Sequence, residues 1–229
     1  MTWLCDFWRS SIGGKVTMAV TGLLLFGFVV AHQLGNLKLL AGPDSINAYA
    51  KMLHDLGPLL WVARIGLLVI FVLHVVTAIR LSSANKAARP VRYSKEATMQ
   101  ATLASRSMVL SGLTVLVFLI YHLLHFTLGV TNPEHFQKKA AGAAGFDVYA
   151  MVTASFANPA IALTYVAAQV VLFLHLSHGM QSLAHTLGLH HARYTPMIKK
   201  LSFLLALLIA GGNAFLALSV LTGIVKGAA

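Results

Sequence analysis

The 229-residue sequence is 58% hydrophobic and only 10% charged, whereas soluble domains carry about 25% charged residues. The net charge of +11 comes from basic residues that cluster in particular connecting segments, so membrane topology explains it and nucleic-acid binding is not expected. The composition therefore excludes an ordinary soluble domain and predicts an all-α integral membrane protein.

Five apolar stretches are long enough to cross a hydrocarbon core about 30 Å thick, which takes about 20 helical residues. We place these transmembrane helices at 16–37, 58–80, 107–130, 159–187 and 200–225, within a single membrane domain that spans 1–229. The first stretch is longer than the core of a signal peptide and is followed by no small-residue cleavage site, so it is predicted to remain as a helix. No internal repeat is apparent.

The basic residues predict the orientation of these helices. Eleven lie in the N-terminus and in the second and fourth connections: Arg9, Lys15, Arg80, Lys86, Arg89, Arg92, Lys95, Arg106, Arg193, Lys199 and Lys200. Six lie in the other connections or the C-terminus: Lys38, Lys51, Arg64, Lys138, Lys139 and Lys226. Because cytoplasmic loops carry the excess of Lys and Arg, the N-terminus is predicted to be cytoplasmic and the C-terminus outside. The stretch 85–95 is also a candidate contact for lipid headgroups or a cytoplasmic partner.

Histidines are the ionisable residues deep inside the predicted spans, because all six Asp and Glu residues lie outside the spans and the Lys and Arg residues lie towards their ends. Four histidines lie at similar depths, measured from where each helix starts: 17 residues from Lys15 to His32, and 16 from Pro58 to His74, from Arg106 to His122 and from Pro159 to His175. At 1.5 Å per residue, each lies about 24–26 Å along its helix. An ionisable side chain at such a depth usually faces the bundle interior and has a partner.

Helix direction arranges these four histidines in two pairs. The first and third helices run outward, so His32 and His122 share an outer level. The second and fourth run inward, so His74 and His175 share an inner level, about 10–20 Å from the other. Two pairs of imidazoles at two depths suit two haems, each iron held axially by one nitrogen from each of two helices. The first four helices are therefore predicted to form a haem-binding bundle.

A zinc site and a supporting role are the alternatives to haem ligation for histidines in these spans. A zinc site requires more N, S or O ligands than one pair provides, and the spans contain neither Cys nor carboxylate. His125 and His178 each follow a predicted ligand by three positions, which on an α-helix is about 60° round the axis. They are candidates to contact a haem propionate, a quinone or a water, or to make structural hydrogen bonds. Residues that favour close helix packing in general are Gly22, Gly27, Gly66, Gly112, Gly211 and Gly212.

Four stretches carry a resemblance to a known family: SSIGGKVTMAVTGLLLFGFVVAHQLGNL (10–37), INAYAKMLHDLGPLLWVARIGLLVIFVLHVVTAIRL (46–81), ASRSMVLSGLTVLVFLIYHL (104–123) and LHLSHGMQSLAHTLG (174–188). The chain resembles, from about Trp8 to Val225, the cytochrome b subunit of succinate dehydrogenase or fumarate reductase, of the five-helix, two-haem type. In that family one histidine on each of the first four helices ligates haem b. The matching positions are His32, His74, His122 and His175, paired as the depths predict.

The resemblance implies a membrane anchor in the bacterial cytoplasmic membrane, bound on its cytoplasmic side by a flavoprotein subunit and an iron–sulfur subunit. Electrons from succinate would pass through iron–sulfur clusters and the inner of the two haem b groups to membrane quinone (menaquinone or ubiquinone), within the tricarboxylic acid cycle, or in reverse towards fumarate. The chain has no dinucleotide fingerprint and no Cys cluster. It is expected to act as the quinone-reactive electron-transfer subunit of the enzyme and not to oxidise succinate alone.

Two alternative functions stay open from the sequence. The first is a cytochrome b of another membrane dehydrogenase, such as a hydrogenase or nitrate reductase. The match at SSIGGKVTMAVTG (10–22) and the single ligand on each helix favour the succinate dehydrogenase family over it. The second is a haem-free transporter, which predicts midplane substrate groups, broken helices or inverted repeats, and none is visible.

The quinone and propionate contacts are predicted less completely. His54 and Asp55, at the outer mouth of the second helix, are candidates to hand protons to the outside, although an ordinary solvated loop explains them as well. An inner quinone site near Ser11 is a second candidate. Candidates to bind the haem propionates are Arg64, Arg80 and Arg106.

Overall fold

The computed structural model describes residues 2–88, 102–137 and 147–227, and in these ranges it contains helices and no strand. The helices are α1 (Thr2–Arg9), α2 (Ser11–Asn36), η1 (Leu37–Ala41), α3 (Pro43–Asp55), α4 (Pro58–Ala87), α5 (Leu103–Arg106), α6 (Met108–His122), η2 (Leu123–Thr127), α7 (Pro133–Gln137), α8 (Val148–Phe156), α9 (Pro159–Thr186) and α10 (Thr195–Leu221). Basic residues of the predicted orientation that lie outside the described residues are Arg89, Arg92, Lys95, Lys138 and Lys139, and most of the stretch 85–95 lies there too.

Among the described residues, five helical segments are long and apolar enough to span a membrane: Ser11–Ala41, Pro58–Ala87, Met108–Thr127, Pro159–Thr186 and Thr195–Leu221. They confirm the predicted all-α, multi-pass architecture. Their ends differ from the predicted spans by a few residues. α2 starts at Ser11 because the Oγ of Ser10 accepts a hydrogen bond from the backbone N–H of Gly13 and caps the helix. α10 ends at Leu221, just before Gly223 adopts a positive φ of 75°.

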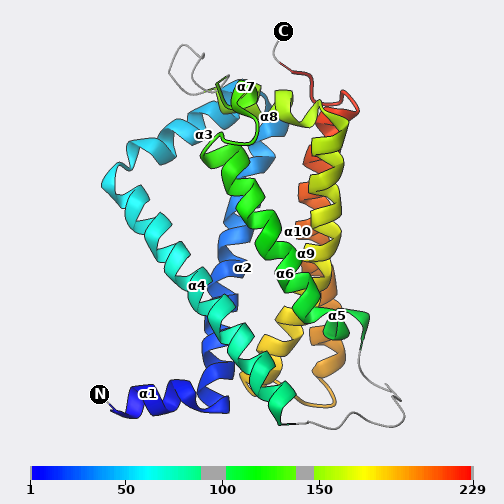
Figure 1. The fold of residues 1–229 in the computed structure, drawn as a ribbon. Coiled ribbons are helices and arrows are strands. Elements are labelled where there is room, and N and C mark those ends of the chain that lie inside the picture. Colours follow the sequence, from blue (N-terminus) through cyan, green and yellow to red (C-terminus); the bar gives the residue numbers. More distant parts are fainter. Residues whose placement is uncertain (1, 89–101, 138–146, 228–229) are drawn as a thin grey trace.

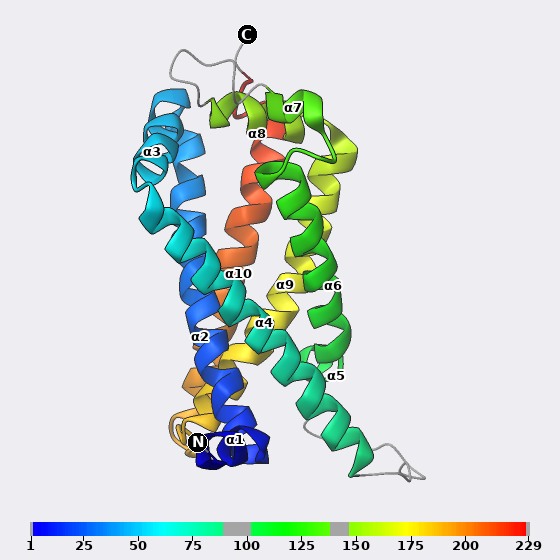
Figure 2. The same ribbon diagram turned by 60° about the vertical axis from the view of Figure 1, so that its left-hand side comes forward.

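The long helices alternate in direction (Figure 1). α2, α6 and α10 run from the lower end of the bundle to the upper end, and α4 and α9 run back, so the two ends of the chain lie at opposite ends of the bundle. The short helices α3, α7 and α8 lie at the upper end and α1 at the lower end. α9 packs against α10, α2 and α6, whereas α4 packs mainly against α2. α4 is tilted relative to the other long helices in both side views (Figures 1 and 2).

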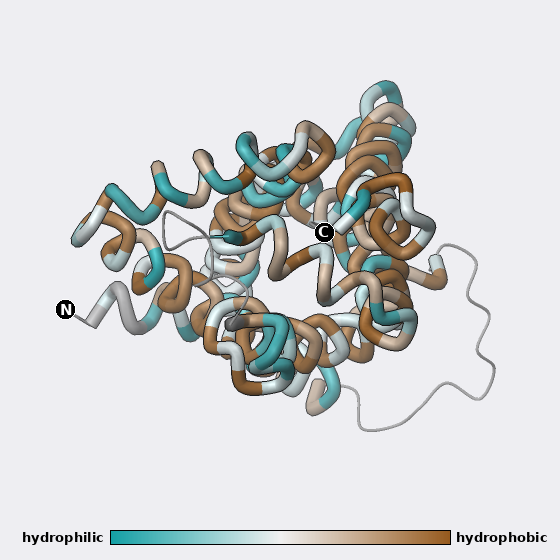
Figure 3. The backbone as a smooth tube through the Cα atoms, turned by 90° about the horizontal axis from the view of Figure 1, so that it is seen from above, coloured by the Kyte–Doolittle hydropathy of each residue, from teal (hydrophilic) through white to brown (hydrophobic). Residues whose placement is uncertain are grey.

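The outward faces of the bundle are apolar. In α4, every residue of which is described, Thr77 is the only buried residue, and Leu59, Trp61 and Val62 are 61–65% exposed. Viewed along the bundle, hydrophobic residues predominate all round the long helices (Figure 3). Such a surface would be unfavourable in water but suits the hydrocarbon region of a bilayer. The surface therefore supports a multi-pass membrane protein.

The third span is not an uninterrupted α-helix. α6 ends at His122, and the chain continues as the π-helical turn η2. A π turn is wider than an α turn and redirects the side chains that follow it. The offset of about 60° between His122 and His125, expected for an α-helix, therefore does not describe this turn.

Candidate functional site

The structure brings the predicted outer pair together. The ring centroids of His32 on α2 and His122 on α6 lie 5.9 Å apart, with the rings at 83°. A metal ion held between two imidazoles, with each nitrogen at about 2 Å, requires centroids about 6 Å apart. A phenylalanine four residues earlier contacts each histidine: Phe28 stacks on His32 at 5.6 Å, and Phe118 lies 6.1 Å from His122. The spacing suits one metal ion shared by two helices.

Each histidine of the predicted inner pair contacts a hydroxyl on the neighbouring helix. The Oγ1 of Thr21 lies 3.0 Å from the Nδ1 of His74, and the Oγ of Ser111 lies 3.3 Å from the Nδ1 of His175. Both hydroxyls already donate their one hydrogen to a backbone carbonyl of their own helix, at 2.7 and 3.1 Å. With that hydrogen on the carbonyl, each hydroxyl is placed to accept from Nδ1–H. This leaves the lone pair of each histidine on Nε2, the nitrogen that is free to bind a metal.

Glycines next to these hydroxyls allow the imidazoles to lie against the helices. A Cβ added at Gly22 would lie 3.4 Å from the Cε1 of His74, and one at Gly112 would lie 3.4 Å from the Cε1 of His175. The predicted close packing is thus correct for these two glycines. It is also correct for Gly212, where an added Cβ would collide with the side chain of Gln33, whereas a Cβ at Gly27, Gly66 or Gly211 would meet no described atom within 4 Å.

These contacts reveal an internal repeat, which corrects the expectation that none is present. TGLLLFGFVVAH (21–32) and SGLTVLVFLIYH (111–122) align without a gap, sharing the hydroxyl–glycine pair, the phenylalanine and the final histidine. The following helices continue the repeat, since Pro58 and Pro159 start α4 and α9 and each precedes its histidine by 16 residues. The chain thus contains two copies of a helix pair, and each copy contributes one histidine to each level.

The spacing within the repeat gives the separation between the inner and outer histidine levels along the helix axis. Thr21 and Ser111, which contact the inner histidines, each precede the outer histidine of the same helix by 11 residues. At 1.5 Å per residue, the inner contacts lie about 16 Å along the helix axis from the outer pair.

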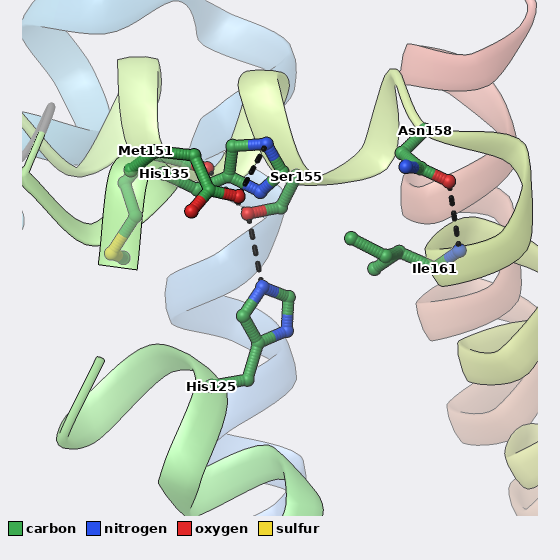
Figure 4. Close-up of polar contacts among 7 residues, drawn as sticks. His125, His135, Met151, Ser155, Asn158 and Ile161 are labelled. Carbon is green, nitrogen blue, oxygen red and sulfur yellow. Dashed lines mark hydrogen bonds and ion pairs between the residues drawn. The ribbon is translucent and has the colours of Figure 1, made fainter. Parts of the chain in front are cut away.

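The hydrogen bonds at the outer level connect more side chains than those at the inner level. The hydroxyl of Tyr165 on α9 lies 3.4 Å from the Nδ1 of His122 and 3.0 Å from the Nδ1 of His125. The Nε2 of His125 lies 3.1 Å from the Oγ of Ser155 on α8, and Figure 4 shows its ring pointing towards this hydroxyl. His125 is 1% exposed. Of the roles expected for His125, hydrogen bonding to the protein is the one that the structure displays.

Arg80 lies in the last third of α4 and carries polar atoms without hydrogen-bond partners among the described residues. Its guanidinium stacks over the ring of Trp8 at 4.4 Å, and a side chain at Gly14 would collide with it. Among the described residues, its buried Nε and Nη2 have no hydrogen-bond partner, and neither does the Oγ1 of Thr77 one turn away. Thr77 is fully buried. Buried donor atoms without a hydrogen-bond acceptor are costly, so these atoms fit an anionic group that the described part of the chain does not supply.

The other candidate residues lie near the surface. Arg64 is exposed and stacks on Trp61 at 5.1 Å, and Arg106 is exposed at the end of α5. Asp55 pairs with Lys51 at 2.6 Å with both side chains more than half exposed. His54 and Ser11 are exposed, and His178 is half-buried on α9. The structure does not gather these residues into a quinone site.

The hydroxyl partners of the histidines are not predicted from the sequence; they are Thr21, Ser111, Ser155 and Tyr165. Their signal was present only in part, as a Thr–Gly or Ser–Gly pair 11 residues before a histidine. Among the described residues, no three His, Cys, Asp or Glu side chains converge as a metal-ligand group. Comparisons with protein-family models, with curated proteins and with solved structures found no match to the chain.

Proposed function

We propose that the chain is the di-haem b membrane anchor subunit of a succinate:quinone oxidoreductase, in the bacterial cytoplasmic membrane. It would carry electrons between an iron–sulfur subunit and membrane quinone, either menaquinone or ubiquinone, and would have no activity towards succinate by itself. One observation carries the proposal: four helices contribute one histidine each. The rings of His32 and His122 lie against each other, and the inner two histidines each lie against a hydroxyl of the neighbouring helix. The resemblance of 10–37, 46–81, 104–123 and 174–188 to the cytochrome b family agrees with it.

The four histidines and the residues around them suit axial ligation of haem. Thr21 and Ser111 hold the inner imidazoles by Nδ1, which fixes the tautomer and leaves Nε2 as the donor atom. Phe28 and Phe118 provide apolar surface beside the outer imidazoles, which suits an apolar macrocycle. When bound, haem b supplies a one-electron carrier whose potential depends on its axial ligands and their hydrogen bonds.

Arg80 is the propionate candidate that the structure favours over Arg64 and Arg106. It lies six residues beyond His74, about 9 Å nearer the inner surface. Its unpaired Nε and Nη2, with the unpaired Oγ1 of Thr77, offer donors to a carboxylate in a region of low water content. Arg64 and Arg106 are exposed and have no comparable need for an anion.

The basic residues at one end of the bundle support a location for the partner subunits. The lower end carries basic residues that include Arg9, Lys15, Lys86, Lys199 and Lys200, which suits the cytoplasmic side by the positive-inside rule. We place the flavoprotein and iron–sulfur subunits at this end, near the inner histidine pair. Such a complex links succinate oxidation in the tricarboxylic acid cycle to the quinone pool, or runs in reverse as a fumarate reductase.

An optical spectrum of the purified chain tests the proposal. The expected result is two b-type haems per chain after reduction with dithionite. Absence of b-type absorbance, from protein isolated with its partners from the native membrane, would overturn the proposal and favour a haem-free transporter. Co-purification with a flavoprotein and an iron–sulfur subunit that reduce quinone with succinate is expected. Co-purification with a different dehydrogenase would show a cytochrome b of another complex.

A further inference from the structure

We infer that His125 sets the direction of a hydrogen-bonded chain that runs from Ser155 through Tyr165 to His122, and so keeps the Nε2 of His122 free for the outer haem iron. This makes His125 a positioning residue, since it acts on the ligand through Tyr165. The inference rests on the proposed function, because it concerns how one haem ligand is held. The distances among these four side chains support it.

The direction of the chain follows from counting hydrogens. Ser155 donates its one hydroxyl hydrogen to the backbone carbonyl of Met151 at 2.8 Å, so at 3.1 Å it accepts from the Nε2–H of His125. A neutral His125 with its hydrogen on Nε2 has an acceptor at Nδ1, which takes the hydroxyl hydrogen of Tyr165 at 3.0 Å.

The last contact of the chain joins Tyr165 to His122, the proposed haem ligand. With its hydrogen given to His125, the Tyr165 oxygen is an acceptor towards His122, 3.4 Å from its Nδ1. This is the longest contact of the chain and the weakest by distance. His122 therefore carries its hydrogen on Nδ1 and its lone pair on Nε2. In this arrangement His122 matches His74 and His175, which give Nδ1–H to Thr21 and Ser111.

The outer site needs His125 because its hydroxyl comes from a tyrosine. Thr21 and Ser111 lie close enough to their own helix backbone to give their hydrogen to a carbonyl. The hydroxyl of Tyr165 lies at the far end of a ring, and its described contacts are with the two imidazoles. Without His125, the Tyr165 hydrogen would turn towards the Nδ1 of His122. The neutral His122 would then carry its hydrogen on Nε2, where iron must bind.

The surroundings hold His125 in this position. The π-helical turn η2 carries it directly after α6, and it is almost completely buried. Phe126 stacks on its ring at 4.0 Å, and Tyr121 lies at 5.6 Å. A polar ring buried so fully is costly unless both nitrogens are paired, and here both are.

The test compares His125→Leu, Tyr165→Phe and the double variant, each purified with its partner subunits. The readouts are haem content and the redox titration of each haem, and His32→Ala serves as the reference for loss of the outer haem. We expect His125→Leu to weaken retention of the outer haem by about 10–100-fold. Tyr165→Phe alone should have a smaller effect. The double variant should recover most of the outer haem, because no hydroxyl is left to donate to His122.

Two controls separate chain direction from packing. In His125→Asn the side-chain oxygen takes the place of Nδ1 and accepts from Tyr165, so the outer haem should be retained. Tyr121→Phe keeps the ring beside His125 and Tyr165 and should leave both haems unchanged. Should His125→Leu fail to accumulate, Ser155→Ala tests the other end of the chain. It removes the acceptor for Nε2–H, and we expect partial loss of the outer haem, again reversed by Tyr165→Phe.

The outcomes are distinct. If His125→Leu leaves the outer haem unchanged, or if the double variant is no better than His125→Leu, the inference is wrong while the di-haem function stands. If the unmodified complex contains no haem, both fail together.

Discussion

The Oγ1 of Thr21 lies 3.0 Å from the Nδ1 of His74, across the contact between α2 and α4. Because Thr21 donates its hydroxyl hydrogen to the carbonyl of Thr17 at 2.7 Å, its oxygen is placed to accept from the Nδ1–H of His74. A residue on one transmembrane helix thus determines which nitrogen of a histidine on the next helix can bind a metal. Ser111 stands in the same relation to His175.

Thr21→Val should remove this acceptor while keeping the shape of the side chain. We expect retention of the inner haem to weaken by about 10–100-fold. The inner haem should also take a more positive potential, since His74 becomes a poorer electron donor. Haem content and redox titration measure both effects. Thr21→Ser keeps the hydroxyl and serves as the control, and a Thr21→Val variant with an unaltered inner haem would contradict the role of Thr21.

Alanine at any one of the four ligand positions should remove one haem, and the two ligands of the same haem should give the same result. His32→Ala and His122→Ala should lose the same haem, and His74→Ala and His175→Ala the other, as judged by optical spectra. Combining the two changes of a pair should add little, because one missing axial ligand already disrupts that site. Loss of a haem from His125→Ala but not from His122→Ala would overturn the assignment, and the same comparison applies to His178 and His175.

Gly22→Val should displace the imidazole of His74, because even a Cβ at this position lies 3.4 Å from its Cε1 and a branched side chain reaches further. We expect loss of most of the inner haem and a lower melting temperature of the purified protein. Gly27→Val on the same helix is the matched control, since a Cβ there meets no described atom within 4 Å. Equal effects from the two substitutions would show that helix propensity, not the contact with His74, is responsible.

Arg80→Met should weaken the inner haem and leave the outer one unchanged. The substitution keeps much of the side-chain length but removes the buried donors that have no described partner within the chain. Redox titration of both haems measures the effect, and Arg64→Met, at an exposed position, is the control. A protein that becomes more stable without losing haem would instead mean that Arg80 is only a buried charge.

The sequence by itself determined the membrane class, the five spans and the four histidines at matched depths. Spanning a bilayer takes about 20 apolar residues, and ionisable residues are so costly there that each one stands out. Helix direction and the rise per residue then assigned His32 to His122 and His74 to His175, without knowledge of how the helices pack.

Only the tertiary structure decided which side chains hold those histidines. The contact between Thr21 and His74, the π turn after His122 and the meeting of Tyr165 with two imidazoles depend on how neighbouring helices are rotated and tilted. Hydropathy does not report rotation, because the lipid-facing and inward sides of these helices are both apolar. For the same reason the repeated Thr–Gly and Ser–Gly pairs became meaningful only when each was found against a histidine of the next helix.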